Sequence, residues 1–350
     1  MKIGFIGLGK LGLPVALAIE AAGHEVWGYD SNPAIMDMVA YRSKLPYVEE
    51  GAQELLDHTM IQVADPGNIT DWADLVFVAV QTPHQPEYEG ITRLPETRAD
   101  FDYSHLATAI SSVLDKTEAK QIVVISTVLP GTIERLCGRT DRVLYNPFFI
   151  AMGTTIPDFR DPEFVLIGTD GAHPQPLVEF YKTIHDKPTF VTTIKTAELT
   201  KVAYNTYIGM KIVFANTMME LCHKTGADVD DLVEALSLGT DRIVSERYLR
   251  GGMGDGGGCH PRDNIALSWL ARQHKLSFDL FDALMDARER QTEWLARLAT
   301  AYNKPITLLG KAYKPETNLT VGSPALLLSS ILTEDGYPHE HEDAHVSDHD

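Results

Sequence analysis

The first thirty residues carry the pattern that most constrains how this chain folds. Residues 2–7 (KIGFIG) form a short apolar run, the turn GLGKLG follows, and residues 13–23 (LPVALAIEAAG) have helical periodicity. A second apolar run, residues 24–30 (HEVWGYD), ends at Asp30. Strand, glycine turn, helix and strand in this order predict a βαβ unit at the start of a parallel sheet.

The three glycines of the turn predict a dinucleotide site. Gly7 allows the tight turn, Gly9 removes a side chain where a pyrophosphate approaches, and Gly12 lets helix and strand pack closely. The free N–H groups at the helix start then face the phosphates. A glycine turn that only packs a βαβ unit is the alternative interpretation. The remaining turn residues are expected at the same cofactor site: Leu8, Lys10 and Leu11.

Asp30 predicts which dinucleotide is bound. It follows the glycines at the spacing at which a carboxylate accepts hydrogen bonds from the ribose hydroxyls. Its negative charge repels a 2′-phosphate, so the sequence favours NAD over NADP as the cofactor.

Four more apolar runs alternate with helical segments. They cover residues 74–83, 121–132, 141–147 and 164–168. This rhythm predicts an α/β fold with a doubly wound, mostly parallel sheet, in which ligands bind at the carboxyl ends of the strands. Two threonines stand at such ends and either cap a turn or contact cofactor or substrate: Thr82 and Thr127.

Residues 195–226 predict one long helix, with Thr196 as its N-cap and Gly226 just past its end. So long and apolar a helix needs cover on several sides, which suggests a domain core or a dimer interface. Lys201 and Asn205 are four residues apart and share one face. The lysine either extends along apolar surface to reach water or faces a polar pocket.

A glycine-rich stretch ends in a lone cysteine. Residues 251–263 read GGMGDGGGCHPRD, and a helical pattern follows. Cys259 is therefore expected at a helix N-terminus beside Arg262, and both features lower the pKa of a thiol. The preceding glycines let a ligand approach the backbone. We interpret Cys259 as a nucleophile, against the alternative of a structural cysteine.

Length and charge exclude several classes of function. The chain has 350 residues, enough for two domains or more, and a formal net charge of −19 that disfavours nucleic acid as a partner. No run has the length of a membrane span, and the first residues do not resemble a signal peptide. Three cysteines show neither a disulfide framework nor metal-ligand spacing, so we expect a cytoplasmic protein without a metal.

Seven motifs in order give the chain a family resemblance. They read FIGLGKLGLPVA, VWGYDSNP, QTP, STVLPGT, AELTKVAYN, GGGCHPRD and KPETNLTVGSPA. With them the sequence resembles the nucleotide-sugar dehydrogenases of the UDP-glucose 6-dehydrogenase and GDP-mannose dehydrogenase type. The resemblance implies an NAD-binding Rossmann domain (1–194), a central helical domain that forms a homodimer (195–300) and an incomplete C-terminal nucleotide-sugar-binding unit (301–350).

The resemblance also implies a reaction and the residues that carry it. Such enzymes oxidise a sugar's primary alcohol to a carboxylate with two NAD⁺ and no metal, and Cys259 matches the nucleophile that captures the aldehyde. Lys201 and Asn205 match residues that stabilise negative charge on the sugar oxygen. Asp263 matches the carboxylate that positions water, and Thr127 matches the threonine that lies near that water and the nicotinamide.

Other positions match residues that bind the substrate or the cofactor. Arg242 matches an arginine that reaches the sugar from a neighbouring subunit, and Arg262 joins the cofactor site. The further substrate-binding matches are Phe149, Gly256, Gly257 and Lys314.

The sequence departs from the family pattern at several places. Phe148 and Met152 replace two glutamates, the first of which assists thioester hydrolysis, and Val321 replaces an arginine of the cofactor site. After residues 305–310 (PITLLG) and 323–336 (SPALLLSSILTEDG), which predict one strand and one helix, the tail YPHEHEDAHVSDHD is expected to be a solvated acidic end rather than a metal site.

The sequence therefore predicts oxidation of the C6 alcohol of a UDP-glucose-like nucleotide sugar. A β-hydroxyacid dehydrogenase, which needs a single hydride transfer and no thiol, is the alternative within enzymes. A catalytically impaired NAD or nucleotide-sugar binder is the alternative outside them, motivated by the departures at Phe148, Met152 and Val321.

Overall fold

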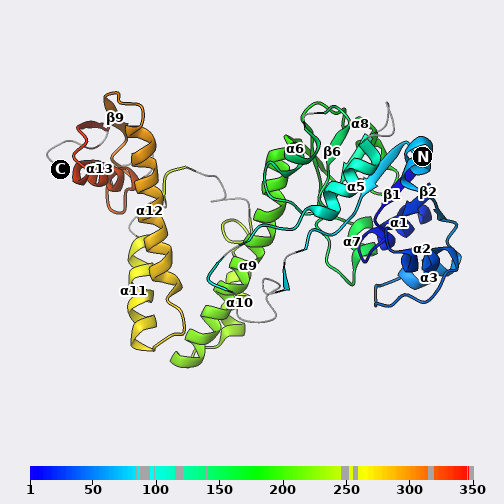
Figure 1. Ribbon diagram of the computed structural model, residues 1–350. Coiled ribbons are helices and arrows are strands. Elements are labelled where there is room, and N and C mark those ends of the chain that lie inside the picture. The colour runs from blue at the N-terminus through cyan, green and yellow to red at the C-terminus, as the bar shows by residue number, and fades with distance from the viewer. Residues whose placement is uncertain are drawn as a thin grey trace. The chain divides into compact units, whose positions relative to one another are not determined.

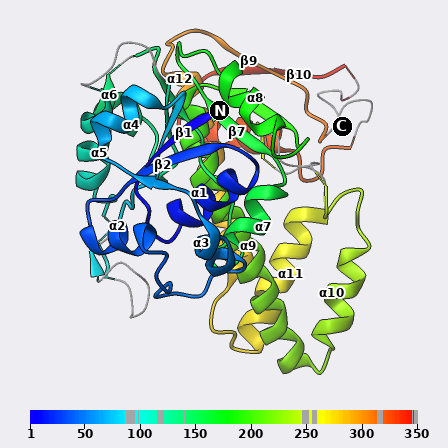
Figure 2. The ribbon, with the colours of Figure 1, turned by 90° about the vertical axis from the view of Figure 1, so that its right-hand side faces the viewer.

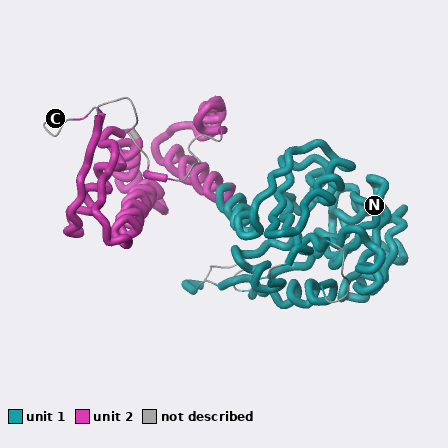
Figure 3. Tube along the Cα trace, turned by 90° about the horizontal axis from the view of Figure 1, so that it is seen from above, with its two compact units in different colours: residues 1–207 teal, residues 208–350 magenta. Residues whose placement is uncertain are grey.

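The chain divides into two compact units, Met1–Tyr207 and Ile208–Asp350, each of which is described by itself (Figure 3). The computed structural model describes residues 1–83, 85–86, 95–97, 99–114, 121–138, 140–245, 252–254, 259–313, 319–344 and 346.

The first unit is built on one eight-stranded sheet. Its strand order is β3-β2-β1-β4-β5-β6-β7-β8, and all neighbours pair parallel except β6 with β7. The doubly wound, mostly parallel sheet predicted from the sequence is confirmed. The strands are β1 (Lys2–Ile6), β2 (Glu25–Tyr29), β3 (Gln62–Val63), β4 (Leu75–Val78), β5 (Gln121–Val124), β6 (Val143–Tyr145), β7 (Val165–Gly168) and β8 (Thr189–Thr192).

Helices cover both faces of this sheet (Figure 1). Side chains alternate between the faces along each strand, so Phe5 and Phe77 stack on one face with ring centroids 5.2 Å apart, while Ile6 and Val78 point to the other. The first face packs against α1, α3, α7 and α8, and the second against α4, α5, α6 and the start of α9. Helix bounds are α1 (Gly12–Ala21), α2 (Pro33–Ala40), α3 (Ala52–His58), α4 (Pro66–Trp72), α5 (Ser104–Leu114), α6 (Thr132–Cys137), α7 (Thr155–Arg160), α8 (Gln175–Lys182) and α9 (Ile194–Thr225).

Helix α9 runs through 32 residues, which confirms the predicted long helix. Gly226 follows it with φ at 81°, as expected of the residue after a helix end. The predicted N-cap, Thr196, is wrong. Helix α9 begins earlier, at the buried Ile194. Thr193, just before it, accepts a hydrogen bond through its Oγ1 from the Thr196 N–H at 3.2 Å.

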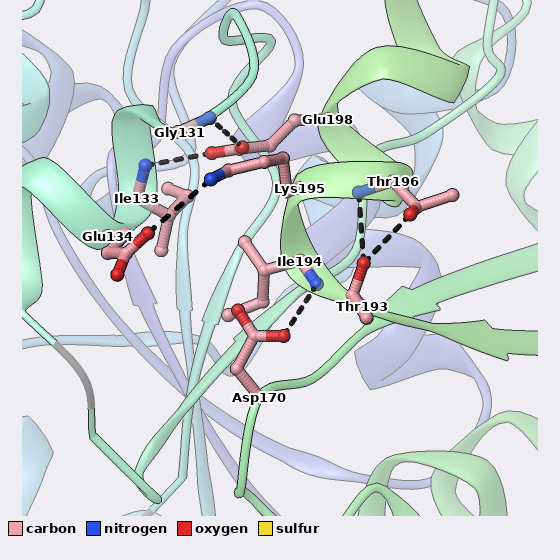
Figure 4. A network of polar contacts seen from close by, with 9 residues as sticks. All are labelled: Gly131, Ile133, Glu134, Asp170, Thr193, Ile194, Lys195, Thr196 and Glu198. Atoms are coloured by element: carbon pink, nitrogen blue, oxygen red, sulfur yellow. Dashed lines mark hydrogen bonds and ion pairs between the residues drawn. The ribbon is translucent and has the colours of Figure 1, made fainter. Parts of the chain in front are cut away.

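A buried carboxylate attaches α9 to the loop after β5 (Figure 4). Glu198 is fully buried, and its two oxygens accept from the N–H of Gly131 and, at 2.8 Å, from the N–H of Ile133. Burial raises the pKa of Glu198, although both N–H groups favour the carboxylate. Nearby, Lys195 Nζ lies 3.7 Å from Glu134, where both side chains are largely exposed.

In the second unit, the last turns of α9 pack around Met218 and Leu221 against α11 (Cys259–Gln273) and α12 (Leu280–Thr300), and Leu232 of α10 (Val229–Ser237) packs against the same cluster (Figure 2). Helix α11 begins at Cys259, so the predicted helix start is confirmed. The apolar residues that hold these helices together are Met218, Leu221, Ala271 and Phe281.

The chain continues into β9 (Ile306–Leu309), α13 (Pro324–Glu334) and β10 (His339–Glu342). The tail, predicted without a strand, contributes β10, which pairs parallel with β9 while Glu340 and Glu342 stay exposed as expected. The alternation HEHE turns its histidines to one face, where His339 Nε2 lies 2.6 Å from Ser329 Oγ and His341 Nε2 lies 3.0 Å from the Gly310 carbonyl oxygen.

The first prediction concerns the Glu198 attachment. Glu198→Ala leaves two N–H groups without their acceptor, which should lower the free energy of unfolding by about 3 kcal/mol. Glu198→Gln keeps one acceptor oxygen and should lose roughly half as much. Urea unfolding followed by circular dichroism measures both. Lys195→Gln, which removes an exposed charge of the same network, is the control and should change stability by less than about 0.5 kcal/mol. Equal stability of Glu198→Ala and the control would show that the two hydrogen bonds do not hold α9.

Candidate cofactor and substrate site

The glycine turn lies where the strand order reverses. Strand β1 has β2 on one side and β4 on the other, and ligands bind at the carboxyl ends of such strands. Gly7 has φ at 101°, and its N–H donates to the Tyr29 carbonyl at 2.8 Å. A Cβ on Gly7 would collide with the backbone of Ala79, just after β4. The turn is therefore pressed against the end of β4, and only glycine fits there.

Gly12 and Gly9 differ in what surrounds them. A Cβ on Gly12 would overlap the Gly7 carbonyl oxygen, so this glycine lets the helix start close to the turn. At Gly9 a Cβ would meet no atom within 4 Å, which leaves open space beside the backbone. Leu11 precedes α1 without a side-chain cap, and Lys10 is exposed. These observations fit the approach of a pyrophosphate to the helix start.

Asp30 is fixed by the backbone around it. Its Oδ2 accepts from the Leu8 N–H at 2.9 Å and its Oδ1 accepts from the Asn32 N–H at 2.9 Å. Leu8 is itself buried against Gly28, where a Cβ would lie 2.8 Å from the leucine side chain. The half-buried carboxylate is thus held directly after β2, with acceptor capacity left for a ribose hydroxyl.

The two threonines expected at strand ends are brought together. Thr82 Oγ1 donates to the Thr127 carbonyl oxygen at 2.7 Å, and next to it Ser126 Oγ donates to the Val80 carbonyl at 2.5 Å. Both hydrogen bonds join the chain after β4 to the chain after β5. The Thr82 hydroxyl therefore has a structural partner, while Thr127 is half-buried at the carboxyl edge of the sheet.

Lys201 lies against the loop after β6. It is 8% exposed, and its Nζ lies 5.0 Å from the centre of the Phe149 ring. Burial lowers the pKa of the Lys201 ammonium from its ordinary value of 10.5. Of the two interpretations that the sequence left open, extension to water is wrong for this buried lysine, which faces an aromatic ring. Asn205, one turn further along α9, is exposed.

The other predicted site residues of the second unit are exposed. Arg262 Nε lies 2.9 Å from Asp263 Oδ1, so the predicted cofactor arginine and catalytic aspartate form an ion pair with each other. Arg242 lies in the turn that follows α10. The side chain of Cys259 and the predicted substrate residues Gly256, Gly257 and Lys314 lie outside the described residues.

The departures from the family pattern have different surroundings. Phe148 packs on Phe159, with ring centroids 5.6 Å apart, and lines a cavity of about 20 Å³ together with Asp158. Asp158 already accepts from the Ala151 N–H and the Thr154 hydroxyl, at 2.9 and 3.0 Å. Met152 and Val321 are exposed. An apolar contact therefore occupies the position at which the family resemblance implies a glutamate.

Sequence reasoning missed Glu198, which joins two parts of the site. Its partner Gly131 lies four residues after Thr127, and Lys201 lies one helical turn after Glu198. The carboxylate therefore fixes the loop of Thr127 against the helix of Lys201. The available signal was an acidic residue within the buried start of an apolar helix, which requires a partner.

Neither a metal centre nor a membrane span is found within the described ranges. No group of three or more histidine, cysteine, aspartate or glutamate side chains within these ranges is arranged to hold a metal ion. Among the helices assigned there, none combines the length and apolarity needed to cross a membrane.

Comparison with known proteins identifies the family. The NAD binding domain model of the UDP-glucose/GDP-mannose dehydrogenase family matches residues 1–185, and the model of its central domain matches residues 195–290. The UDP-glucose 6-dehydrogenase of Rhizobium meliloti is 29% identical, over 96% of this chain and 80% of that protein. The GDP-mannose 6-dehydrogenase of Pseudomonas aeruginosa is 28% identical, with the same shares covered.

Solved structures agree with these matches. A ternary complex of GDP-mannose dehydrogenase from Pseudomonas aeruginosa has a TM-score of 0.86 at 27% identity, covering 97% of this chain and 80% of that chain. A UDP-glucose dehydrogenase from Pyrobaculum islandicum has a TM-score of 0.60 at 27% identity, covering 98% and 82%. The chain therefore belongs to the UDP-glucose/GDP-mannose dehydrogenase family, whose first domain binds NAD.

Proposed function

We propose that this protein oxidises the C6 alcohol of a UDP-glucose-like nucleotide sugar to the uronic acid, with two NAD⁺ per sugar. The observation that carries the proposal is the buried Lys201 beside Phe149, on a helix that Glu198 joins to the loop of Thr127. A preorganised cation is what an alcohol oxidation needs, because negative charge develops on the sugar oxygen.

The residues of the first unit hold the cofactor. NAD supplies the acceptor for each hydride when it is bound. Gly7 and Gly12 shape the turn, Gly9 leaves room for the pyrophosphate, and Asp30 accepts from the ribose hydroxyls. Thr127 stands at the carboxyl edge of β5, near the reacting end of the dinucleotide.

Cys259 is the nucleophile of the proposed reaction. Cys259 begins α11, where the helix N-terminus and the neighbouring Arg262 favour the thiolate. Its sulfur attacks the aldehyde carbon left by the first hydride transfer, and the carbonyl oxygen gains the negative charge. Loss of a second hydride gives a thioester, which one water molecule hydrolyses to the acid and the thiol. Asp263 positions that water, since Phe148 has no group for proton transfer.

Further residues complete the substrate site. Arg242 reaches the sugar of a neighbouring subunit, and Phe149, Asn205 and Lys314 contact the substrate. The family resemblance adds Gly256 and Gly257 to these substrate-binding residues. We place the homodimer interface on α9 and the protein in the cytoplasm, where the thiol stays reduced. Exposed apolar residues on α9 support the interface: Leu199, Met210, Ile212, Val213, Phe214 and Met219.

GDP-mannose is the second candidate substrate. The TM-score of 0.86 with GDP-mannose dehydrogenase favours it. Incubation of the full chain with NAD⁺ and either nucleotide sugar, counting NADH per sugar, tests the proposal. Two NADH with one sugar support it, one NADH favours a β-hydroxyacid dehydrogenase, and binding without NADH favours a nucleotide-sugar binder.

Cys259→Ser should abolish acid formation while NAD binding stays nearly unchanged, because an alcohol is a far weaker nucleophile than a thiolate. Product analysis measures the acid, calorimetry measures NAD binding, and mass spectrometry searches the wild-type protein for a sugar adduct on Cys259. Cys222→Ser, at a buried cysteine in α9, is the matched control. Undiminished acid output from Cys259→Ser would remove the thiol from the mechanism.

Asp30→Ala should weaken the preference for NAD over NADP, because the charge that repels the 2′-phosphate is gone. The ratio of kcat/KM values for the two cofactors measures this preference. Asp37→Ala, an exposed carboxylate on α2, is the control that should leave the ratio unchanged. An unaltered ratio in Asp30→Ala would place Asp30 away from the ribose.

Lys201 should set the alkaline limit of the reaction. The ammonium is the active form, and burial lowers its pKa from the ordinary value of 10.5. As the pH rises, Lys201 therefore loses its proton, and the rate falls, at a lower pH than an ordinary lysine would. Lys201→Arg keeps the charge, so its lower rate should persist to higher pH, whereas Lys201→Ala should lose roughly 100-fold or more in kcat. Profiles of kcat against pH measure both, and an identical alkaline limb in Lys201→Arg would contradict the assignment.

A further inference from the structure

The ring beneath the Lys201 ammonium is held on two sides. Phe149 packs on Phe164 with ring centroids 4.7 Å apart, and on Tyr204 with ring centroids 4.6 Å apart. Phe164 precedes β7, whereas Tyr204 lies on α9, three residues after Lys201 and therefore on the same side of the helix. The Phe149 ring thus lies in a cluster formed by the strand entry and the helix.

A hydrogen bond closes this cluster. Tyr204 Oη donates to Glu163 Oε2 at 2.8 Å, and Glu163 is the residue directly before Phe164. One pair of adjacent residues therefore restrains Phe149 twice, through the Phe164 ring on one side and through the Glu163–Tyr204 hydrogen bond on the other. Without that bond, α9 and the entry to β7 lose a direct polar connection at this point.

We propose that Tyr204 and Glu163 are positioning residues for Lys201, and this inference rests on the proposed function. Their hydrogen bond fixes the Phe149 ring, and the ring fixes the ammonium that lies 5.0 Å from its centre. Lys201 must meet a developing charge on one oxygen, and a displacement of about 1 Å can cost up to 100-fold in rate. The Glu163 side chain is exposed, so the same bond contributes little to stability.

The expected result separates position from stability. Tyr204→Phe keeps the ring and loses the hydroxyl, and Glu163→Leu loses the acceptor. Each should lower kcat roughly ten-fold, with the KM for NAD⁺ unchanged and the melting temperature shifted by about 2 °C or less. Glu163→Gln keeps an acceptor oxygen and should retain wild-type kcat. The double variant Tyr204→Phe/Glu163→Leu should be no worse than either single variant, because both remove one interaction.

A second measurement does not depend on turnover. Reductive methylation followed by peptide mass spectrometry should label Lys201 faster in Tyr204→Phe and Glu163→Leu than in the wild-type protein. Lys195, whose side chain is 65% exposed, is the internal reference, and Tyr207→Phe, which removes a hydroxyl on the same helix, is the matched control. An inactive wild-type protein would contradict the proposed function, whereas the labelling would still test the restraint on Lys201.

Three outcomes would overturn the inference. Glu163→Gln as impaired as Glu163→Leu would show that the carboxylate charge matters and not the hydrogen bond. Additive losses in the double variant would show that the two residues act separately. Unchanged kcat and unchanged Lys201 labelling in Tyr204→Phe would show that the bond positions nothing.

Discussion

The position of α9 on the sheet of the first unit depends on the hydrogen bonds of one buried carboxylate. Glu198 has no exposed surface, and a charge so placed is tolerated only because two backbone N–H groups meet it. Those groups belong to Gly131, at the end of the loop after β5, and to Ile133, in the first turn of α6, so the requirement to satisfy Glu198 also helps to fix where α9 starts on the sheet. Everything that α9 carries along its next turn, Lys201 first, takes its position from this contact.

The proposed cofactor site and the Lys201 site both lie at the carboxyl edge of the sheet because the strands that lead to them are parallel. The strand order reverses at β1, which lies between β2 and β4, and parallel strands bring the loops after β4, β5 and β6 to the edge of the sheet where the glycine turn lies. In the proposed function the first loops bind the dinucleotide, and the loop after β6 places Phe149 against Lys201. Phe148, where the family resemblance implies a glutamate, is held in the same loop by packing on Phe159.

Much of this could be predicted from the sequence, for a physical reason in each case. Apolar runs predicted the inner strands, and the spacing of the glycines predicted the turn whose Leu8 N–H donates to Asp30. The short edge strands β3 and β8 lack such runs, since their side chains are only partly covered. Strand β10 alternates histidine and glutamate with the period of two that is typical of a strand. Because these residues are polar or charged, the sequence indicated a solvated tail instead. The partners of Glu198 lie more than sixty residues away in the chain, so no local pattern could reveal them.

The two hydrogen bonds of Asp30 have an evolutionary consequence. The same carboxylate that would exclude a phosphorylated ribose also satisfies the N–H groups of Leu8 and Asn32. A lineage that exchanged it for a neutral or basic residue would release two turns at once, the one before α1 and the one before α2. In the proposed function, selection for NADP in place of NAD and selection for rigid turns at the dinucleotide site therefore act on one side chain. A change of cofactor preference would require compensating substitutions in both turns.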